Sequence, residues 1–133
     1  MKVSKMKGFT LIELLIVLVI LGLLASLVAP KMFSKVDSSK IKTAETQLKL
    51  IETALDTYRL DLGQHPENLD ELIKSSKKNW DGPYLPKDIP LDPWGNPYVY
   101  TVPGIDGKTF SLMSYGKDGR VGGADDNADI VLQ

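Results

Sequence analysis

The chain has 133 residues and a formal net charge of −1, with 16 basic side chains, 17 acidic side chains and no cysteine. This length allows one globular domain beside a membrane segment, and the near-neutral charge argues against the basic surface of a nucleic-acid-binding protein. The absence of cysteine excludes disulfides, thiolate metal sites and cysteine nucleophiles.

The first predicted element is an apolar helix at residues 9–29, in which Glu13 is the only ionisable side chain. At about 1.5 Å rise per residue this helix reaches roughly 30 Å, which is enough to cross a membrane. Lysines precede it, so the positive-inside rule predicts a cytoplasmic N-terminus and an exported remainder. A charge at membrane depth costs about 2.5–3.5 kcal/mol, so we expect Glu13 to find a partner on another molecule.

Three interpretations of this segment follow from the residues. Ala25-Ser26-Leu27 weakly imitates the site at which an ordinary secretory signal is cut. A plain single-pass anchor with Glu13 near the membrane surface is the second interpretation. The third is cleavage before the apolar run, between Gly8 and Phe9, which leaves the helix on the mature protein.

The run Lys7-Gly8-Phe9-Thr10-Leu11-Ile12-Glu13 resembles the class III signal of type IV pilins and pseudopilins. The resemblance implies that a prepilin peptidase cuts after Gly8 and methylates the new N-terminus at Phe9. It also implies that Glu13 attracts the N-terminal amine of a neighbouring subunit, and two buried opposite charges would relieve each other's desolvation. Pro30 matches a proline of the family, which favours a kinked helix that continues over one that ends there.

An amphipathic helix is predicted next, because apolar residues recur at three- and four-residue steps. These residues are Ile41, Ala44, Leu48, Ile51, Leu55, Tyr58 and Leu62. Gly63 supplies a left-handed stop, and Pro66 prevents an immediate restart. We expect the helix to pack on the sheet of its own domain and a second, short helix to form at residues 67–75.

Residues 81–98 are rich in proline, which disfavours both helix and central strand. Asp92-Pro93-Trp94-Gly95-Asn96-Pro97 is predicted to form consecutive tight turns. Nearby aromatic residues favour packing onto the helix over sugar or peptide binding. They are Trp80, Tyr84, Trp94 and Tyr98. Gly82-Pro83-Tyr84-Leu85 and residues 92–98 resemble the major pseudopilins of type II secretion, whereas adhesive pilins commonly carry a C-terminal cysteine pair.

Residues 99–102 and 109–114 are predicted to be antiparallel strands, and a glycine-rich loop follows at residues 114–130. Its four aspartates are Asp118, Asp125, Asp126 and Asp129. Calcium takes six to eight oxygens, and glycines let carbonyls turn inward, so the loop is either a calcium site or a solvated acidic loop. Its spacing matches neither an EF-hand nor a repeated glycine–aspartate motif.

The resemblance to major pseudopilins favours calcium, because the family's site lies between an Asp-Gly and an Asp-Ile. These match Asp118-Gly119 and Asp129-Ile130. The implied ligands are the side chains of Asp118, Asp125, Asp126 and Asp129 and the backbone carbonyls of Tyr115 and Arg120. The preference between Asp125 and Asp126 stays open, and the chain ends in Val131-Leu132-Gln133 where many members continue with Gly-Asn-Trp.

These features predict an α+β, type IV pilin-like fold, in which a long N-terminal helix packs on a small antiparallel sheet with a C-terminal calcium-binding loop. The predicted organisation is a leader at residues 1–8, a transmembrane and filament-core helix at 9–30 and a periplasmic domain at 31–133. The expected function is a structural subunit, not an enzyme. It would polymerise into the periplasmic pseudopilus of a type II secretion system and drive protein export across the outer membrane.

The resemblance implies a homopolymer whose partners are minor pseudopilins, prepilin peptidase, the inner-membrane assembly platform and inner-membrane lipid, without nucleic acid. The subunit would begin as a single-pass inner-membrane protein with a cytoplasmic N-terminus and then join the periplasmic filament. Three alternatives remain: a motility or adhesion pilin, a monomeric membrane-anchored calcium receptor, and a secreted enzyme. No nucleophile–base constellation in the sequence supports the enzyme.

Overall fold

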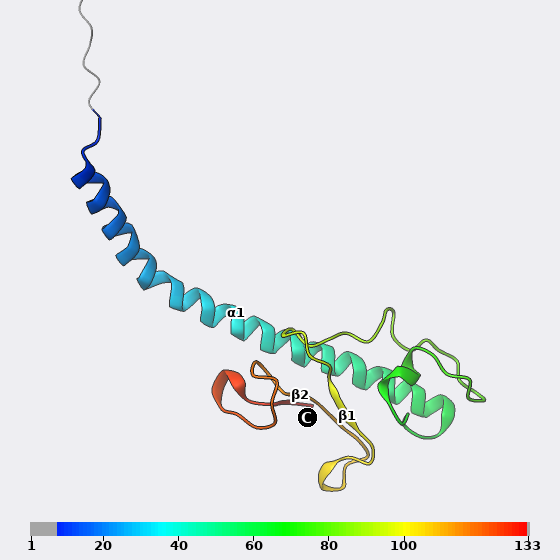
Figure 1. The fold of residues 1–133 in the computed structure, drawn as a ribbon. Helices are drawn as coiled ribbons and strands as arrows, with labels where there is room; N and C mark the ends of the chain where they lie inside the picture. The colour runs from blue at the N-terminus through cyan, green and yellow to red at the C-terminus, as the bar shows by residue number, and fades with distance from the viewer. Residues whose placement is uncertain (1–7, 133) are drawn as a thin grey trace, which may run out of the picture. The chain divides into compact units, whose positions relative to one another are not determined.

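The computed structural model describes residues 8–132 (Figure 1). Its elements are the helix α1 (Leu11–Leu62), the 3₁₀ helices η1 (Leu69–Leu72), η2 (Ile105–Gly107) and η3 (Asp125–Asn127), and the strands β1 (Val99–Thr101), β2 (Ser111–Ser114) and β3 (Ile130–Val131). The chain divides into two compact units, Met1–Val36 and Asp37–Gln133, and α1 contributes residues to both. The predicted leader lies outside the described residues except for Gly8.

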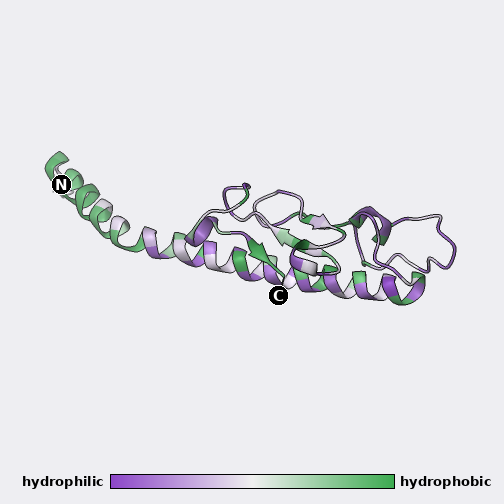
Figure 2. Ribbon diagram, turned by 90° about the horizontal axis from the view of Figure 1, so that it is seen from below, coloured by the Kyte–Doolittle hydropathy of each residue, from purple (hydrophilic) through white to green (hydrophobic). Residues whose placement is uncertain are grey.

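The N-terminal unit exposes an extended apolar surface along α1, and Figure 2 colours the first part of this helix mostly as hydrophobic. Among the described residues of this unit no apolar side chain is buried, and Leu11 is 82% exposed. By length and composition this part of α1 is sufficient to cross a membrane. Pro30 lies inside α1, so the helix continues past it as predicted. A surface of this size requires cover from lipid or from other protein.

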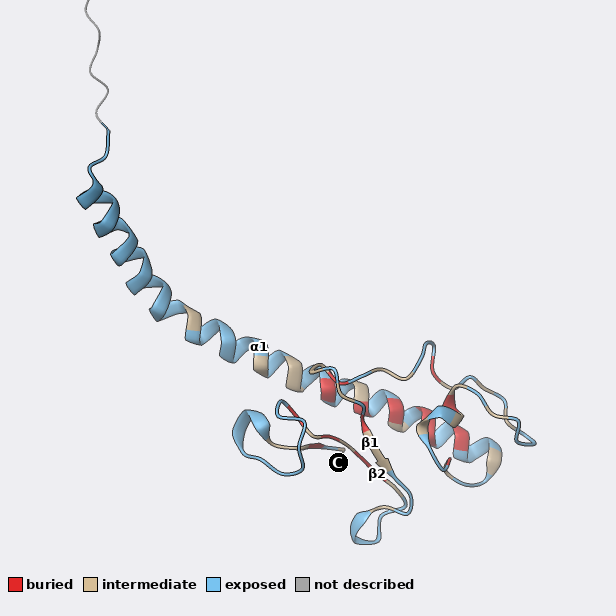
Figure 3. Cartoon of the chain, in the orientation of Figure 1, coloured by how far each residue is buried: buried red, intermediate tan, exposed pale blue. Residues whose placement is uncertain are grey.

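The C-terminal unit has its core on one face of α1 (Figure 3). The buried residues of the helix are Ala44, Leu48, Ile51, Ala54, Leu55 and Tyr58. They pack with Leu72 of η1, Leu112 of β2 and Ile130 of β3, so the predicted apolar stripe is confirmed as the packing face. Full burial of one such side chain contributes about 1.5–3 kcal/mol, which makes this stripe the main source of cohesion.

The sheet has three antiparallel strands in the order β1-β2-β3. The predicted hairpin is confirmed, with Tyr100 opposite Leu112. β3 was not among the predicted strands, and it pairs with β2 through Ser114 opposite Ile130. The two residues of β3 are too few to show the alternation of apolar and polar side chains that indicates a strand in a sequence. β3 is therefore recognised only by its pairing with β2.

The predicted helix at residues 67–75 was too long, because only η1 forms there. The Trp80 Nε1 donates to the Glu71 carbonyl oxygen at 2.7 Å, and the Tyr84 N–H donates to the Leu72 carbonyl oxygen at 2.8 Å. These carbonyls would have accepted the hydrogen bonds of further helical turns. The proline-rich segment therefore ends the helix and is fastened to η1 by the same contacts.

Candidate functional site

The start of α1 places the residues of the predicted processing and assembly site. Gly8 and Phe9 lie in an exposed, non-helical segment before the helix. The Glu13 N–H donates to the Thr10 Oγ1 at 3.1 Å, and the Leu14 N–H donates to the Thr10 carbonyl oxygen at 3.2 Å. Thr10 thus caps the helix, and an acid in its first turn is favoured by the helix dipole. The Thr-x-x-Glu spacing, typical of a capping box, was the signal for this local role, which the sequence interpretation missed.

The acidic loop places its four aspartates in two different environments. The Asp118 Oδ1 accepts from the Arg120 N–H at 3.1 Å, and the Asp129 Oδ2 accepts from the Gly122 N–H at 3.0 Å. The Asp129 Oδ1 is buried, and no hydrogen-bond donor among residues 8–132 reaches it. The other two, Asp125 and Asp126, are exposed on η3, and Tyr115 is half-buried at the start of the loop.

Two glycines allow the beginning and the end of this loop to approach each other. A Cβ atom on Gly116 would lie 2.5 Å from the Ala128 carbonyl oxygen, and one on Gly123 would overlap the Asn127 carbonyl oxygen. The Asp118 Oδ2 also faces Gly123, at 3.2 Å from that Cβ position. Both glycines have positive φ, +77° and +98°, which other residues rarely adopt. The loop therefore brings the Asp118 carboxylate and the Asn127 carbonyl oxygen close to Gly123.

Within residues 8–132, no group of three or more acidic or histidine side chains is placed to hold a metal ion. The structure thus does not gather the four aspartates, and any ion in this loop needs backbone carbonyls among its ligands. Such mixed sets are usual for calcium, which accepts carbonyl oxygens and carboxylates in flexible geometry. The ligand set implied by the resemblance stays a prediction.

A buried carboxylate on the neighbouring turn supports the loop, and the sequence interpretation did not single it out. Asp92 is only 3% exposed. Its Oδ1 accepts from the N–H groups of Trp94 and Asn96 at 3.0 and 2.9 Å, and its Oδ2 accepts from the Ser114 Oγ at 2.8 Å. The Ser114 Oγ in turn accepts from the Gly116 N–H at 3.1 Å. Asp92 therefore links the predicted tight turn to the first residue of the loop.

A second contact ties the loop to α1. The Lys117 Nζ lies 3.2 Å from the Asp37 Oδ2, and these residues are 80 positions apart. An exposed pair of this kind contributes about 0–1 kcal/mol, so its main consequence is to place the loop beside the first residues of the C-terminal unit.

The corner between η1 and the proline-rich segment holds an ion pair with perturbed titration. The Lys77 Nζ lies 2.7 Å from the Glu71 Oε1, and the Glu67 N–H donates to the Glu71 Oε2 at 2.7 Å. Burial opposes ionisation of Glu71, but the hydrogen bonds from Lys77 and the Glu67 backbone outweigh it and lower the pKa of the Glu71 carboxyl. The corner is therefore held by a carboxylate that must stay ionised.

Comparison with known proteins identifies the family. The prokaryotic N-terminal methylation motif matches residues 3–29, and the family described as type II secretion system (T2SS), protein G matches residues 31–133. The chain belongs to the protein G family of type II secretion. Among curated members, the type II secretion system core protein G of Pseudomonas aeruginosa is 44% identical, across 98% of this chain and 96% of that one. The one from Xanthomonas campestris is 38% identical, across 95% and 89%.

A solved structure supports the same family assignment. The crystal structure of the major pseudopilin from the type 2 secretion system of enterohaemorrhagic Escherichia coli matches with a TM-score of 0.59 and 28% identity. The match covers 77% of this chain and 93% of that chain. The pilin-like fold predicted from sequence is confirmed, and the protein is a major pseudopilin of type II secretion. The methylation motif implies processing by a prepilin peptidase.

Proposed function

We propose that this pseudopilin works without catalysis, as a subunit that passes from the inner membrane into a periplasmic filament. The observation that carries the proposal is the uncovered apolar surface of α1 around one carboxylate, Glu13. Lipid covers this surface before assembly, and the helices of neighbouring subunits cover it afterwards. Lysines before the helix keep the N-terminus cytoplasmic, and the C-terminal unit is periplasmic. Minor pseudopilins and an inner-membrane platform would start the filament, whose growth drives protein export.

Glu13 has two roles in this proposal, one local and one between subunits. The backbone N–H of Glu13 donates to the Thr10 Oγ1 at the start of α1, and this bond leaves the side-chain carboxylate available to another subunit. After cleavage between Gly8 and Phe9, the amine of Phe9 on an incoming subunit becomes the partner of Glu13. Each charge alone is costly inside an apolar filament core, whereas the pair relieves both costs. Subunits would therefore join only in the register that brings the two charges together.

The test follows processing and assembly in cells that produce the full chain with its secretion system. Mass spectrometry of the mature protein is expected to find methylated Phe9 at the N-terminus. Glu13→Gln keeps the length and polarity of the side chain but removes its charge, so this variant should be processed normally and be lost from sheared filaments. Thr10→Ala is the control for a weakened cap, and it should retain filaments. A mature N-terminus near Leu27, or normal filaments from Glu13→Gln, would contradict the proposal.

We also propose that the acidic loop binds calcium. The support is the buried Asp129 Oδ1 without a donor, and the approach of the Asp118 Oδ2 and the Asn127 carbonyl oxygen to Gly123. Asp118 and Asp129 would hold the ion together with backbone carbonyls. A bound cation supplies positive charge where two carboxylates otherwise repel. It would thereby join the beginning of the loop to its end and order the loop for contact with a neighbour.

The calcium proposal is tested by unfolding the full chain with calcium and with a chelator. An ion at about 100 times its Kd would stabilise the folded unit by about 2.7 kcal/mol. The Asp129→Asn variant should lose this calcium-dependent increment, whereas Asp106→Asn, on the separate turn η2, should keep it. An identical melting temperature with calcium and with chelator would contradict the proposal that the loop binds calcium.

A further inference from the structure

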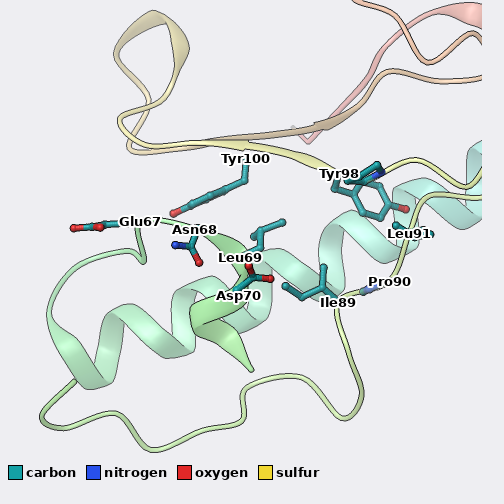
Figure 4. Close-up of a pocket in the computed structure, with 10 residues that line it drawn as sticks. Glu67, Asn68, Leu69, Asp70, Ile89, Pro90, Leu91, Tyr98 and Tyr100 are labelled. Carbon is teal, nitrogen blue, oxygen red and sulfur yellow. The ribbon is translucent and has the colours of Figure 1, made fainter. Parts of the chain in front are cut away.

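A groove of about 380 Å³ lies between η1 and the proline-rich segment (Figure 4). Its apolar walls come from Leu69, Ile89, Pro90, Leu91, Tyr98 and Tyr100. Figure 4 shows Glu67 at one end of the groove and Leu91 at the other. Leu91 is 55% exposed, so the apolar wall is open to a partner.

The groove is also acidic. Glu67 and Asp70 line it and are exposed, and none of its lining residues is basic. In the part of the chain that the structure describes, neither carboxylate forms a salt bridge. A complementary partner therefore combines an apolar side chain with an adjacent base, because such a pair would meet both the apolar wall and the carboxylates.

Two apolar side chains of the C-terminal unit outside the groove are exposed far more than the others: Leu60 at 84% and Val121 at 76%. Leu60 stands between Arg59 and Asp61, whose opposite charges cancel. Val121 follows Arg120, and the flanking residues of this pair are glycines. Arg120 forms no salt bridge within residues 8–132. The Arg120-Val121 tip thus has the chemistry that the groove requires.

The tip does not cover the groove of its own chain. The loop that carries the tip borders one end of the groove, because a Cβ atom on Gly119 would lie 3.1 Å from the Asn96 Nδ2, next to the groove residue Pro97. Val121 is nevertheless 76% exposed and Leu91 is 55% exposed, so the two surfaces do not bury each other within one chain. Both surfaces are therefore open to a second copy.

We propose that the Arg120-Val121 tip of one subunit docks in the groove beside η1 of another subunit. Val121 lies against the apolar wall, and Arg120 faces Glu67 and Asp70. The contact joins two different surfaces, so the subunit that supplies the tip keeps a free groove and the subunit that supplies the groove keeps a free tip. Such head-to-tail contacts extend into open helical filaments. The inference rests on the proposed polymerisation and names one of the surfaces through which it occurs.

The test uses disulfide cross-linking, because the natural chain contains no cysteine. Full-length protein with Val121→Cys and Asn68→Cys, the latter at the groove, is assembled into filaments and oxidised. A ladder of covalent multimers is expected, since each subunit then links to two others. Val121→Cys with Ile105→Cys, on η2, is the matched control and should yield no ladder. Filaments without a ladder from the Asn68 pair overturn the docking but leave polymerisation standing, whereas absence of filaments from the unsubstituted chain overturns both.

Charge reversal provides a second measurement that does not depend on cysteine geometry. Arg120→Glu should reduce filament yield at least roughly fivefold, because it places a third acid against the groove. The combination of Glu67→Lys and Asp70→Lys should reduce it similarly, and joining all three substitutions should restore much of the loss. Equal losses in the triple variant and in the separate variants would overturn the docking.

Discussion

Removal of the Asp92 carboxylate is expected to destabilise the C-terminal unit, because this side chain joins the tight turn to the acidic loop. Asp92 is buried and accepts three hydrogen bonds, and one of them crosses to Ser114 on β2. Asp92→Ala would leave the N–H groups of Trp94 and Asn96 and the Ser114 hydroxyl without their acceptor. The Gly116 N–H, which donates to Ser114, would lose its fixed partner as well.

The magnitude follows from the number and type of these bonds. Each hydrogen bond to a charged group contributes about 1.5–3 kcal/mol, and the desolvation of the carboxylate offsets part of the sum. We expect Asp92→Ala to lower the free energy of unfolding by about 3–5 kcal/mol, against a typical total of about 5–15 kcal/mol. Asp92→Asn keeps an oxygen for the two backbone donors and should cost about 1–2 kcal/mol.

The assay is urea unfolding of the full chain in a mild detergent, followed by tryptophan fluorescence. The chain has 2 tryptophans, and both lie in the C-terminal unit, so the signal reports on that unit alone. Ser114→Ala and the double variant with Asp92→Ala complete a double-mutant cycle. The double variant should cost less than the sum of the single ones by about 1–2 kcal/mol, because each removes the same bond. A loss below about 1 kcal/mol for Asp92→Ala, or strict additivity, would refute the reasoning.

Three other outcomes are expected from the same unfolding assay. Gly116→Ala should destabilise more than Gly95→Ala, because both glycines have positive φ but only the former would place its Cβ against the Ala128 carbonyl; equal losses would contradict the close approach. The folded pKa of Glu71 is lowered, so its stabilisation should be complete above pH about 4.5 and disappear as the pH falls through the folded pKa, and Glu71→Gln should remove this acid dependence. Burial raises the pKa of Tyr100 to about 12, so its contribution should be lost as the pH rises from about 10 to about 12, and Tyr100→Phe should lose less stability over this range than the unsubstituted chain.

The sequence predicted those features that depend on neighbours within a few positions. The apolar run at residues 9–29, the stripe that includes Tyr58, the stop at Gly63 and the turn at residues 92–97 were all identified correctly. Gly63, for example, has a φ of +83°, and its N–H donates to the Arg59 carbonyl oxygen at 2.7 Å. Helical periodicity and turn chemistry are local properties, so they are visible without the fold. The motif at Gly8 and Phe9 carried the broad family for the same reason.

Only the tertiary structure decided the features whose partners are distant in the chain. The end of η1 depends on donors from Trp80 and Tyr84, and β3 exists only through its pairing with β2. The burial of Asp92 depends on Ser114, which is 22 residues away. A sequence does not show which of these distant residues meet, because long-range pairing is selected by the packing of the whole unit. The N-terminal helix and the family were therefore determined by sequence alone, whereas the supports of the loop and the docking groove came from the fold.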